Sequence, residues 1–371
     1  MTGAAPAAPG SLAGGVLVVG TGLIGTSIAL ALSRAGVPTW LDDPDAAAVA
    51  LAAARGAGRR WDGRAVAHAV VAAPPSATVD VLLALQGADA AASYSDVASV
   101  KSQLVTEAEQ RGVRLATWCP AHPVAGRERG GAGAAQADLF LDRSWVLCPL
   151  PGTDEAAVAA TQAVAEVCGA RPVRLDAARH DAVLASLSHV PQLVASALAV
   201  AADALGPAEL ELAGGGFRDG TRVAASDAAL WQEIIAGNRA PVAAALDRVL
   251  TELTRVRDAL GTAAPQDAPV GEVVGDLVSR GSVVRRGLPD KPGAGRSLGR
   301  LVVVVDDRPG ALAGVFDAAA RRGVNVEDVR VEHAVGGRRG QAELLVPASG
   351  VADLGAGLTD AGYTWWPVDA G

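Results

Sequence analysis

Residues 16–25 read VLVVGTGLIG, an apolar run followed directly by three glycines in GxGxxG spacing, Gly20, Gly22 and Gly25. The apolar run predicts a buried strand, and residues 26–34 carry helical spacing that stops at Gly36. The first glycine permits a tight turn, the second lets a pyrophosphate approach the backbone, and the third allows close helix packing. The stretch therefore predicts a strand, turn and helix that bind a dinucleotide.

The residues around this turn predict which dinucleotide is bound. Leu23 and Ile24 open the helix, whose free N–H groups and positive dipole favour phosphate groups. An acid is expected about 20 residues further on, where it accepts hydrogen bonds from the ribose hydroxyls. Asp42 and Asp43 stand there with no arginine directly after them, which favours NAD over NADP. Pro74 follows the strand predicted at residues 69–73 and is expected to cover the cofactor at the same sheet edge.

Strand and helix patterns alternate over the first part of the chain. Further apolar runs predict strands at residues 38–41, 92–96, 114–118 and 144–149. This alternation predicts an α/β fold, a Rossmann-type doubly wound parallel sheet with helices on both faces. From about residue 176 to 260 the strand signal is replaced by long helical patterns that are apolar around most of their circumference. An all-helical dimerisation domain, and hence a homodimer, is expected.

The C-terminal part predicts a small third domain. Residues 261–299 are rich in Gly, Pro and Arg, with a short helix expected at residues 270–280. From residue 301 the order is strand, Asp307-Arg-Pro-Gly310 turn, helix, strand, Gly336-Gly337 hairpin, strand, helix and strand, which is the ferredoxin-like βαββαβ order. The predicted organisation is a disordered N-terminus (1–14), an NAD-binding Rossmann domain (15–172), a helical substrate and dimerisation domain (173–262), a linker (263–299) and the small domain (300–371).

Bulk composition excludes several functional classes. The 371 residues carry a net charge of -8, which argues against a general nucleic-acid binder. No run of about 18 uncharged apolar residues is present, so no membrane segment is expected. The N-terminus lacks the basic start of a secretory signal, and we expect a cytoplasmic protein. The three cysteines lack zinc-site spacing, so buried reduced thiols and no metal are expected.

Three of the five histidines fall between the predicted sheet and the helical segment. His122 directly follows an apolar strand, at the strand end where open α/β sheets bind ligands, and histidine exchanges protons near neutral pH. A lone loop histidine, considered by itself, is structural more often than not. His180 and His189 are nine residues apart, half a turn out of phase on a straight helix. Unless the helix starts or bends between them, His180 is expected to cap or pack.

A series of motifs spans residues 16–260 after the glycine turn. They read DVASVK at 96–101, HPVAGRE at 122–128, ADLF at 137–140 with WVLCP at 145–149, HD at 180–181, SHVPQ at 188–192 and GGGFRDGTR at 214–222. In this order they resemble the successive signatures of prephenate/arogenate dehydrogenases. The resemblance implies NAD-dependent oxidative decarboxylation of prephenate to 4-hydroxyphenylpyruvate in tyrosine biosynthesis.

The resemblance also implies roles for individual residues. His122 accepts the proton of the substrate's ring hydroxyl, and Ser99 orients this histidine beside the cofactor. Arg222 binds a substrate carboxylate, a task suited to a planar, permanently charged fork. Arg218 lies four residues earlier and shares a face with Arg222 if both are on one helix. The remaining implied substrate-binding residues are His189, Ser188, Gln192 and Glu128.

Three positions depart from the family pattern. Arg127 stands where threonine is common, Gly130 where serine is common, and Gln192 where some prephenate-using members carry another histidine. These departures leave open whether the substrate is prephenate, with a keto side chain, or arogenate, with an amino side chain that Glu128 could sense. Arogenate dehydrogenase, which yields tyrosine directly, is therefore the alternative activity. The role of Lys101 in catalysis, loop support or cofactor support is also left open.

The stretch Asp307-Arg-Pro-Gly310-Ala-Leu312 resembles the corresponding part of ACT domains, which are small-molecule regulatory modules. The resemblance implies tyrosine as a feedback effector bound near Asp307, Gly310 and Leu312, where a helix N-terminus receives a carboxylate. A packing or dimerising role for this domain is the alternative. A more remote alternative for the whole chain is an amino-acid-binding regulator with a silent dehydrogenase domain.

Overall fold

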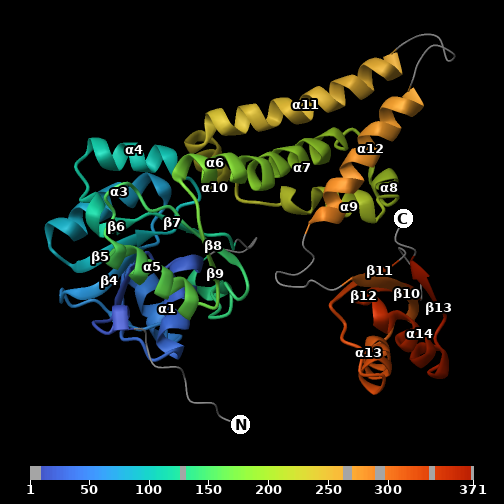
Figure 1. Ribbon diagram of the computed structural model, residues 1–371, viewed down its shortest axis with the longest axis horizontal. Helices are drawn as coiled ribbons and strands as arrows, with labels where there is room; N and C mark the ends of the chain where they lie inside the picture. Colours follow the sequence, from blue (N-terminus) through green and yellow to red (C-terminus); the bar gives the residue numbers. More distant parts are fainter. Residues whose placement is uncertain (1–9, 126–130, 262–269, 289–296, 334–338, 369–371) are drawn as a thin grey trace. The chain divides into compact units, whose positions relative to one another are not determined.

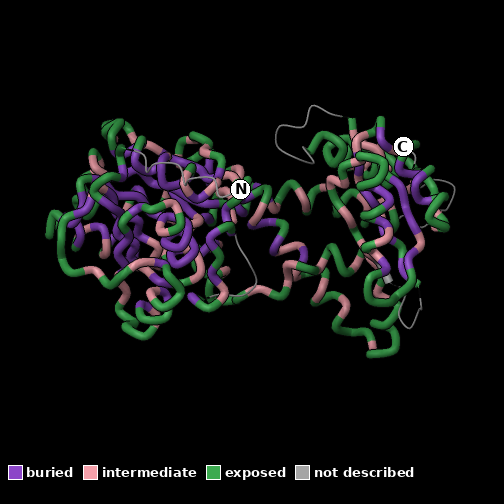
Figure 2. Tube along the Cα trace, turned by 90° about the horizontal axis from the view of Figure 1, so that it is seen from below, coloured by how far each residue is buried: buried purple, intermediate pink, exposed green. Residues whose placement is uncertain are grey.

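The computed structural model describes residues 10–125, 131–261, 270–288, 297–333 and 339–368 (Figure 1). The chain divides into two compact units, Met1–Ala201 with Gly220–Leu277 and Ala202–Asp219 with Val278–Gly371. The first unit contains a parallel sheet and most of the helical segment. In each unit the buried positions gather in the sheets and in the helices beside them (Figure 2).

The first unit is built on a six-stranded parallel sheet in the order β3-β2-β1-β4-β5-β6. The strands are β1 (Val16–Val19), β2 (Thr39–Asp42), β3 (Arg59–Arg60), β4 (Val66–Val71), β5 (Ala91–Asp96) and β6 (Trp118–Cys119). The order reverses direction at β1 and β4, which is the point where doubly wound sheets bind ligands beyond their carboxyl ends. The predicted Rossmann-type sheet is confirmed.

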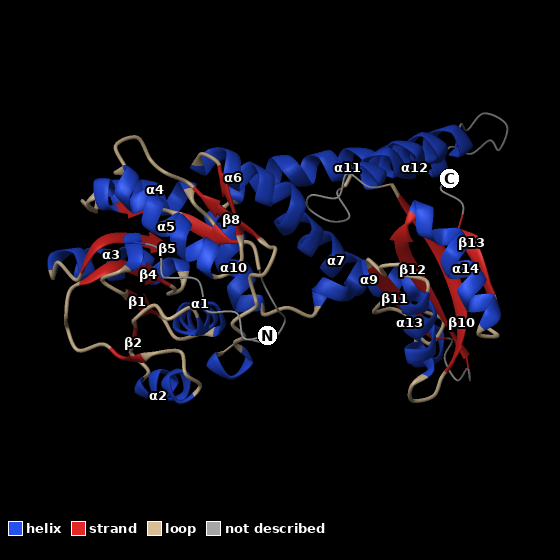
Figure 3. Cartoon of the chain, turned by 60° about the horizontal axis from the view of Figure 1, so that its bottom comes forward, coloured by secondary structure: helices blue, strands red, loops and turns tan. Residues whose placement is uncertain are grey.

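Helices cover both faces of this sheet (Figure 3). Side chains alternate along a strand, so Val16 and Val18 of β1 enter one apolar cluster while Leu17 and Val19 enter the other. The first cluster includes side chains of α1 (Leu23–Arg34), α2 (Ala46–Ala54) and α5 (Glu155–Val167), and the second those of α3 (Pro75–Gly87) and α4 (Ser102–Gln110). With both of its faces buried, β1 is the apolar run expected of a central parallel strand.

A second, three-stranded sheet corrects one expectation. Residues 144–149 were expected to continue the parallel sheet, but β8 (Ser144–Leu147) pairs antiparallel with β7 (Ala121–Pro123) and parallel with β9 (Arg171–Arg174). Pro120 separates β6 from β7 and cannot donate to a ladder, so the chain leaves the large sheet there. The carbonyl of Pro120 instead accepts a hydrogen bond from the N–H of Cys148 at 2.8 Å.

The end of the predicted disordered N-terminus is also corrected. Residues 1–9 lie outside the described residues, but Gly10–Leu12 form a short 3-10 helix, η1. Leu12 is fully buried in the apolar cluster that contains α1 and α5. Burying its apolar side chain stabilises this segment, so order begins before β1.

The helical segment is a series of helices with one wide turn. Its elements are α6 (Ala177–Leu184), the π-helical turn η4 (Ala185–His189), α7 (Val190–Ala201), α8 (Pro207–Leu210), α9 (Gly215–Thr221), the 3-10 turn η5 (Arg222–Ala224), α10 (Ala228–Gly237), α11 (Arg239–Gly261) and α12 (Val270–Gly287). The last of these corrects the linker, because the short helix expected at residues 270–280 extends to Gly287.

Ala177–Ala201 forms a 25-residue helical run that is long and apolar enough to cross a membrane, by length and composition alone. Core helices meet the same criteria. Three polar side chains of this run, His180, Asp181 and His189, are buried and hydrogen bonded within the first unit. The absence of a membrane segment stays a prediction.

The second unit contains a four-stranded antiparallel sheet in the order β11-β12-β10-β13. Its elements follow the predicted βαββαβ order: β10 (Leu298–Asp306), α13 (Ala311–Arg321), β11 (Asp328–His333), β12 (Arg339–Pro347), α14 (Val351–Asp360) and β13 (Trp365–Val368). Val315 of α13 and Leu354 and Leu358 of α14 join Leu301 and Val303 in one buried core. The Gly336-Gly337 turn lies outside the described residues.

Candidate active site

The glycine turn has the shape that a dinucleotide requires. Gly20 has a φ of 101°, in the left-handed region, and a Cβ there would overlap the carbonyl of Ala72. A Cβ on Gly25 would overlap the carbonyl of Gly20. By contrast, a Cβ on Gly22, the N-cap of α1, would meet nothing within 4 Å. The outer two glycines therefore permit the packing of the turn, and Gly22 leaves open the space in front of α1.

Asp42, the last residue of β2, and Asp43, which follows it, have different roles. Asp43 Oδ2 accepts hydrogen bonds from the backbone N–H of Thr21 at 2.6 Å and from its hydroxyl at 3.0 Å, and so ties β2 to the glycine turn. The carboxylate of Asp42, at the end of β2, has no hydrogen bond from the described residues. Asp42 therefore has a carboxylate left to receive ribose hydroxyls, and this role stays a prediction. Pro74 caps α3 at the end of β4, the strand beside β1.

His122 lies on β7 and is 8% exposed. The backbone N–H of the preceding residue, Ala121, donates to Asp96 Oδ2 at 3.4 Å, which places β7 at the carboxyl end of β5. The glycine turn follows β1 at the same edge of the parallel sheet. Burial holds the pKa of His122 well below its usual value, and the neighbouring His180, Lys101 and His189 lower it further. The ring is therefore neutral at pH 7 and able to accept a proton.

The partner of His122 is His180. Nδ1 of His122 lies 2.9 Å from Nε2 of His180, and the two rings meet edge to face with centroids 5.1 Å apart. Ser99, the implied partner, is half-buried, and no hydrogen bond joins it to His122 within the described residues. The helix does change phase between His180 and His189, which is the exception that the sequence left open, and His180 is in direct contact with the candidate base.

Asp181 anchors this pair of rings. Its Oδ1 lies 2.8 Å from His180 Nδ1 and accepts the N–H of Lys101 at 2.9 Å, while Oδ2 accepts the N–H of Ser102 at 2.7 Å. Burial raises the pKa of this carboxyl, but the hydrogen bonds from His180, Ser102 and Lys101 outweigh burial and lower the pKa below its usual value. An ionised carboxylate is therefore held at the N-terminus of α4, where the helix dipole also favours it.

A wide turn brings His180 and His189 into one network. Pro191 has no N–H for a regular helical bond to Leu187, and its ring would clash with that carbonyl in a regular helix. The π-helical turn Ala185–His189 ends two residues before Pro191 and changes the phase of the helix. His189 is 1% exposed, and its Nδ1 lies 3.1 Å from Asn238 Nδ2, which also donates to the Asp181 carbonyl at 2.8 Å. Burial lowers the pKa of His189 to about 4.

A buried ion pair between Lys101 and Asp96 lies next to the site. Lys101 Nζ lies 2.5 Å from Asp96 Oδ1, and both side chains are completely buried. Asp96 also accepts the N–H of Ala98 at 2.9 Å and the indole N–H of Trp118 at 3.2 Å. Since the ammonium is paired with a carboxylate, Lys101 supports the loop after β5, the structural option among those left open by the sequence.

The other predicted substrate residues are placed as follows. Gln192 is 6% exposed on α7, where its side chain contacts the hydroxyls of Ser196 and Ser226. Ser188 is half-buried in the π-helical turn. Arg222 is exposed and begins η5, which packs against α7.

The helix that would align two arginines ends before the second of them. Arg218 is on α9, which stops at Thr221, whereas Arg222 is on η5. The two arginines are also divided between the two compact units. The condition for a shared helical face, that both arginines lie on one α-helix, is therefore not met. Glu128, Arg127 and Gly130 lie outside the described residues.

Sequence reasoning gave no role to Asp181, Asn238 and Asp96, although two of them fell within quoted motifs. The signal for Asp181 and Asn238 was weak, because the backbone groups that Asp181 accepts and both partners of Asn238 are distant in sequence. The three cysteines are free and buried, as predicted, and burial raises the pKa of Cys119 and Cys148 to about 12. The described residues contain no cluster of three or more potential metal ligands.

A Rossmann-type sheet with an open glycine turn, a carboxylate after β2 and a buried neutral histidine at the same edge defines a dinucleotide-dependent dehydrogenase. Comparisons with known proteins specify the class further. Residues 28–174 match the family model for the nucleotide-binding domain of prephenate dehydrogenase, and residues 176–268 match that for its dimerization domain.

Similar proteins cover most of the chain. It is 35% identical over 322 residues to a probable prephenate dehydrogenase, NovF, from Streptomyces niveus, spanning 85% of this chain and 89% of that protein. It is 29% identical over 330 residues to prephenate dehydrogenase of Bacillus subtilis, spanning 85% of this chain and 87% of that protein. The crystal structure of A. aeolicus prephenate dehydrogenase with hydroxyphenyl propionate and NAD+ shares the fold, with a TM-score of 0.64 over 73% of this chain and 98% of that chain at 23% identity. The chain belongs to the prephenate dehydrogenase family.

Proposed function

We propose that this protein oxidatively decarboxylates prephenate to 4-hydroxyphenylpyruvate with NAD. The observation that carries the proposal is the buried, neutral His122 at the edge of the sheet that bears the glycine turn. NAD, when bound, supplies the acceptor for the hydride that leaves C4 of the substrate ring. His122 takes the proton of the hydroxyl on that carbon. The bond between the ring and its carboxylate then breaks, carbon dioxide leaves, and the electrons of that bond complete the aromatic ring as His122 returns the proton to the ring oxygen.

The cofactor proposal follows from the open turn and from Asp42. Gly22 leaves room for the pyrophosphate, and the first N–H groups of α1, including those of Leu23 and Ile24, have no partner within their own helix. The Asp42 carboxylate favours a ribose with free hydroxyls and repels a 2′-phosphate, so it supports NAD over NADP. Ser99 and Pro74 complete the proposed cofactor site.

Substrate binding is assigned to residues near α7. A planar guanidinium suits a carboxylate, which supports Arg222 as the group that holds one of the two carboxylates of prephenate. His189, Ser188 and Gln192 are the proposed wall of the pocket, while the roles of Arg218 and Glu128 stay predictions from the resemblance. Gln192 in place of a histidine leaves arogenate, with its amino group, as the second candidate substrate.

Purified protein is expected to produce NADH when it is mixed with prephenate and NAD. Initial rates measured side by side with prephenate and arogenate, each with NAD and NADP, give kcat/KM for all four combinations, and prephenate with NAD is expected to be the best. A higher kcat/KM with arogenate would move the assignment to arogenate dehydrogenase. Absence of reduced nicotinamide with either substrate would refute the proposed function.

A homodimer through the helical segment is the second proposal. The match of residues 176–268 to a dimerization domain supports it, and so do apolar side chains that the single chain leaves exposed. On α7 and α11 these are Leu198, Val200, Leu250, Leu253 and Leu260, between 43% and 73% exposed. Such a concentration of exposed leucine and valine is typical of a subunit interface.

Light scattering is expected to report twice the chain mass of 37.0 kDa at micromolar concentration. Leu253→Glu should shift this mass towards the monomer, because a charge would be buried without a partner. Leu51→Glu is the matched control, since Leu51 is 47% exposed, as in the interface set, but lies on α2, outside the helical segment. A monomeric mass for the unaltered protein would exclude the dimer.

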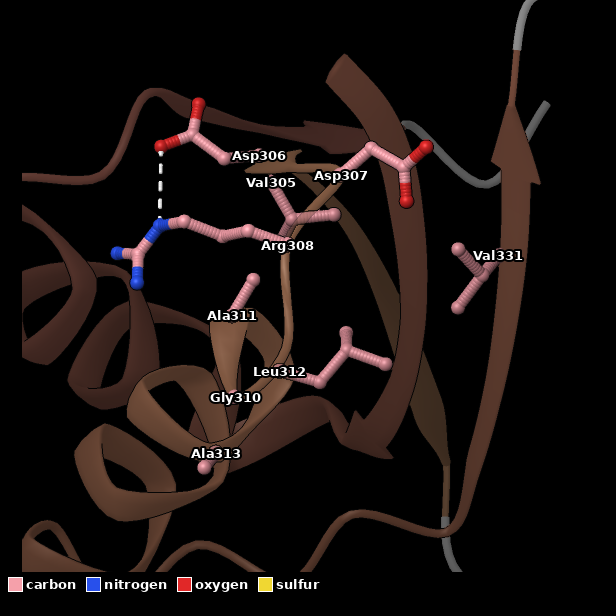
Figure 4. Close-up of a pocket in the computed structure, with 9 residues that line it drawn as sticks. All are labelled: Val305, Asp306, Asp307, Arg308, Gly310, Ala311, Leu312, Ala313 and Val331. Atoms are coloured by element: carbon pink, nitrogen blue, oxygen red, sulfur yellow. Dashed lines mark ion pairs between the residues drawn. The ribbon is translucent and has the colours of Figure 1, made fainter. Parts of the chain in front are cut away.

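We also propose that the C-terminal unit is an ACT-like regulatory domain. A pocket of about 260 Å³ lies at the turn between β10 and α13, and Asp307, Gly310 and Leu312 line it with Val331 of β11 (Figure 4). Gly310 has a φ of 82° and caps α13, so the turn presents the N-terminus of this helix. Tyrosine is the proposed effector. If tyrosine neither binds nor changes the rate, the domain is a packing unit or binds another molecule.

The cytoplasmic location remains a prediction, as do the boundaries at residues 172/173, 262/263 and 299/300. Tyrosine binding by a chain that oxidises neither substrate would favour the remote alternative of a regulator with a silent dehydrogenase domain.

A further inference from the structure

The hydrogen-bonded series from His122 through His180 to Asp181 determines which nitrogen of His122 is free. We infer that His180 and Asp181 are positioning residues that hold His122 with its proton on Nδ1, so that Nε2 presents its lone pair to the substrate hydroxyl. The inference rests on the proposed function of His122 as the base. It adds two residues that neither touch the substrate nor react with it.

The proton arrangement begins at Asp181. This carboxylate already accepts two backbone N–H groups, from Lys101 and Ser102. Being ionised, it has no proton to donate. The 2.8 Å contact between Asp181 Oδ1 and His180 Nδ1 therefore requires the proton on His180 Nδ1.

The arrangement then propagates to His122. A neutral His180 that carries its proton on Nδ1 has a lone pair on Nε2. The 2.9 Å contact of this nitrogen with His122 Nδ1 can be a hydrogen bond only if His122 donates from Nδ1. Since the neutral His122 ring has a single N–H, its Nε2 must be the acceptor nitrogen. This outcome follows from the two ring contacts, from the ionised carboxylate and from taking His180 as neutral.

The same series also stabilises the product of proton transfer. When Nε2 of His122 takes the substrate proton, the buried ring becomes positively charged. Its Nδ1–H continues to donate to His180, which Asp181 polarises through the second hydrogen bond. The other nearby cation, Lys101, is neutralised by Asp96. Asp181 is thus the one carboxylate hydrogen bonded to this pair of rings in the described residues, and it remains ionised throughout.

The first experiment measures the tautomer directly. In uniformly ¹⁵N-labelled protein at pH 7.5, long-range ¹H–¹⁵N spectra distinguish a protonated ring nitrogen from one with a lone pair, and the His122 signal is assigned by its loss in His122→Asn. We expect a protonated Nδ1 and an unprotonated Nε2 for His122. A proton on Nε2 of His122 in the unaltered protein would overturn the inference. Because this readout does not need turnover, it is independent of whether the proposed reaction is correct.

Two substitutions of His180 separate positioning from packing. In His180→Gln, the side-chain carbonyl can accept from His122 Nδ1 while the amide donates to Asp181, so the His122 tautomer is retained. In His180→Met, of similar volume, the thioether accepts only weakly from His122 Nδ1 and has no hydrogen to donate to Asp181, so both functions are lost. We expect kcat to fall by about 10²–10⁴-fold in the methionine variant and much less in the glutamine variant, with the dissociation constant for NAD unchanged in both. Equal values of kcat in the two variants would contradict the inference.

Asp181→Asn tests the origin of the arrangement. When the asparagine oxygen keeps the N–H of Ser102, the amide group takes the place of Oδ1, faces His180 and reverses both tautomers, and the N–H of Lys101 loses its acceptor. The His122 proton should then appear on Nε2 in the ¹⁵N spectrum, and kcat should fall by about 10²–10⁴-fold. A folded variant that keeps the proton of His122 on Nδ1 would show that Asp181 does not control it.

Discussion

Replacing His122 by asparagine is expected to lower kcat by about two to four orders of magnitude and to leave the affinity for NAD unchanged. Asparagine removes the nitrogen that accepts the substrate proton but keeps a donor that can reach His180 Nε2. The loss therefore reflects proton transfer rather than collapse of the site. NAD binding, followed by quenching of tryptophan fluorescence, is expected to remain because the glycine turn follows β1 and Asp42 ends β2, both separate from β7.

The chain provides a matched control for this substitution. His68 is also completely buried, on β4, with its ring nitrogens 2.9 Å and 2.8 Å from the hydroxyls of Ser93 and Ser95. Burial lowers its pKa to about 3, so it too is a neutral ring. His68→Asn is expected to reduce stability with little change in kcat. If His122→Asn turns over as fast as His68→Asn, His122 is not the base.

Lys101→Met is expected to destabilise the first unit by about 3–5 kcal/mol, because it leaves the charge of Asp96 buried without its partner. Lys101 and Asp96 are both completely buried, and their contact is 2.5 Å long. The unfolding free energy can be measured by urea titration with tryptophan fluorescence, to which Trp118 contributes since its indole donates to Asp96. Activity should fall as well, because Asp96 also accepts the N–H that precedes His122.

Removing the buried charge together with its partner tests the cause. The double variant Lys101→Met, Asp96→Asn is expected to recover part of the lost stability, because no uncompensated charge remains. Arg111→Met is the exposed control: Arg111 is 40% exposed and pairs with Asp80 and Glu107 on the surface. It should cost no more than about 1 kcal/mol. A similarly small loss in Lys101→Met would show that the Asp96–Lys101 pair contributes no more than a surface ion pair.

The parts of the fold that the sequence predicted are those controlled by local patterns. The strand, glycine turn and helix at residues 16–34 follow from an apolar run, three glycines and helical spacing, and the βαββαβ order of the C-terminal unit follows in the same way. The local pattern predicts that a segment is a strand, but it does not predict which of several distant strands that segment pairs with. Residues 144–149 read as a strand, but whether β8 joined the large sheet or paired with β7 depended on the break at Pro120.

The sequence by itself identified the glycine turn as the cofactor site, because three glycines follow a recognisable strand, and it implied His122 as the base through the resemblance of its motif to the family's. It could not identify the partner of His122. A straight helix puts His180 and His189 on opposite sides, and the π-helical turn before Pro191 removes that constraint. Only the tertiary structure joined β7, α6 and α4 through His180, Asp181 and the backbone of Lys101 and Ser102. Hydrogen bonds between elements depend on distances in space, and spacing along the chain does not encode those distances.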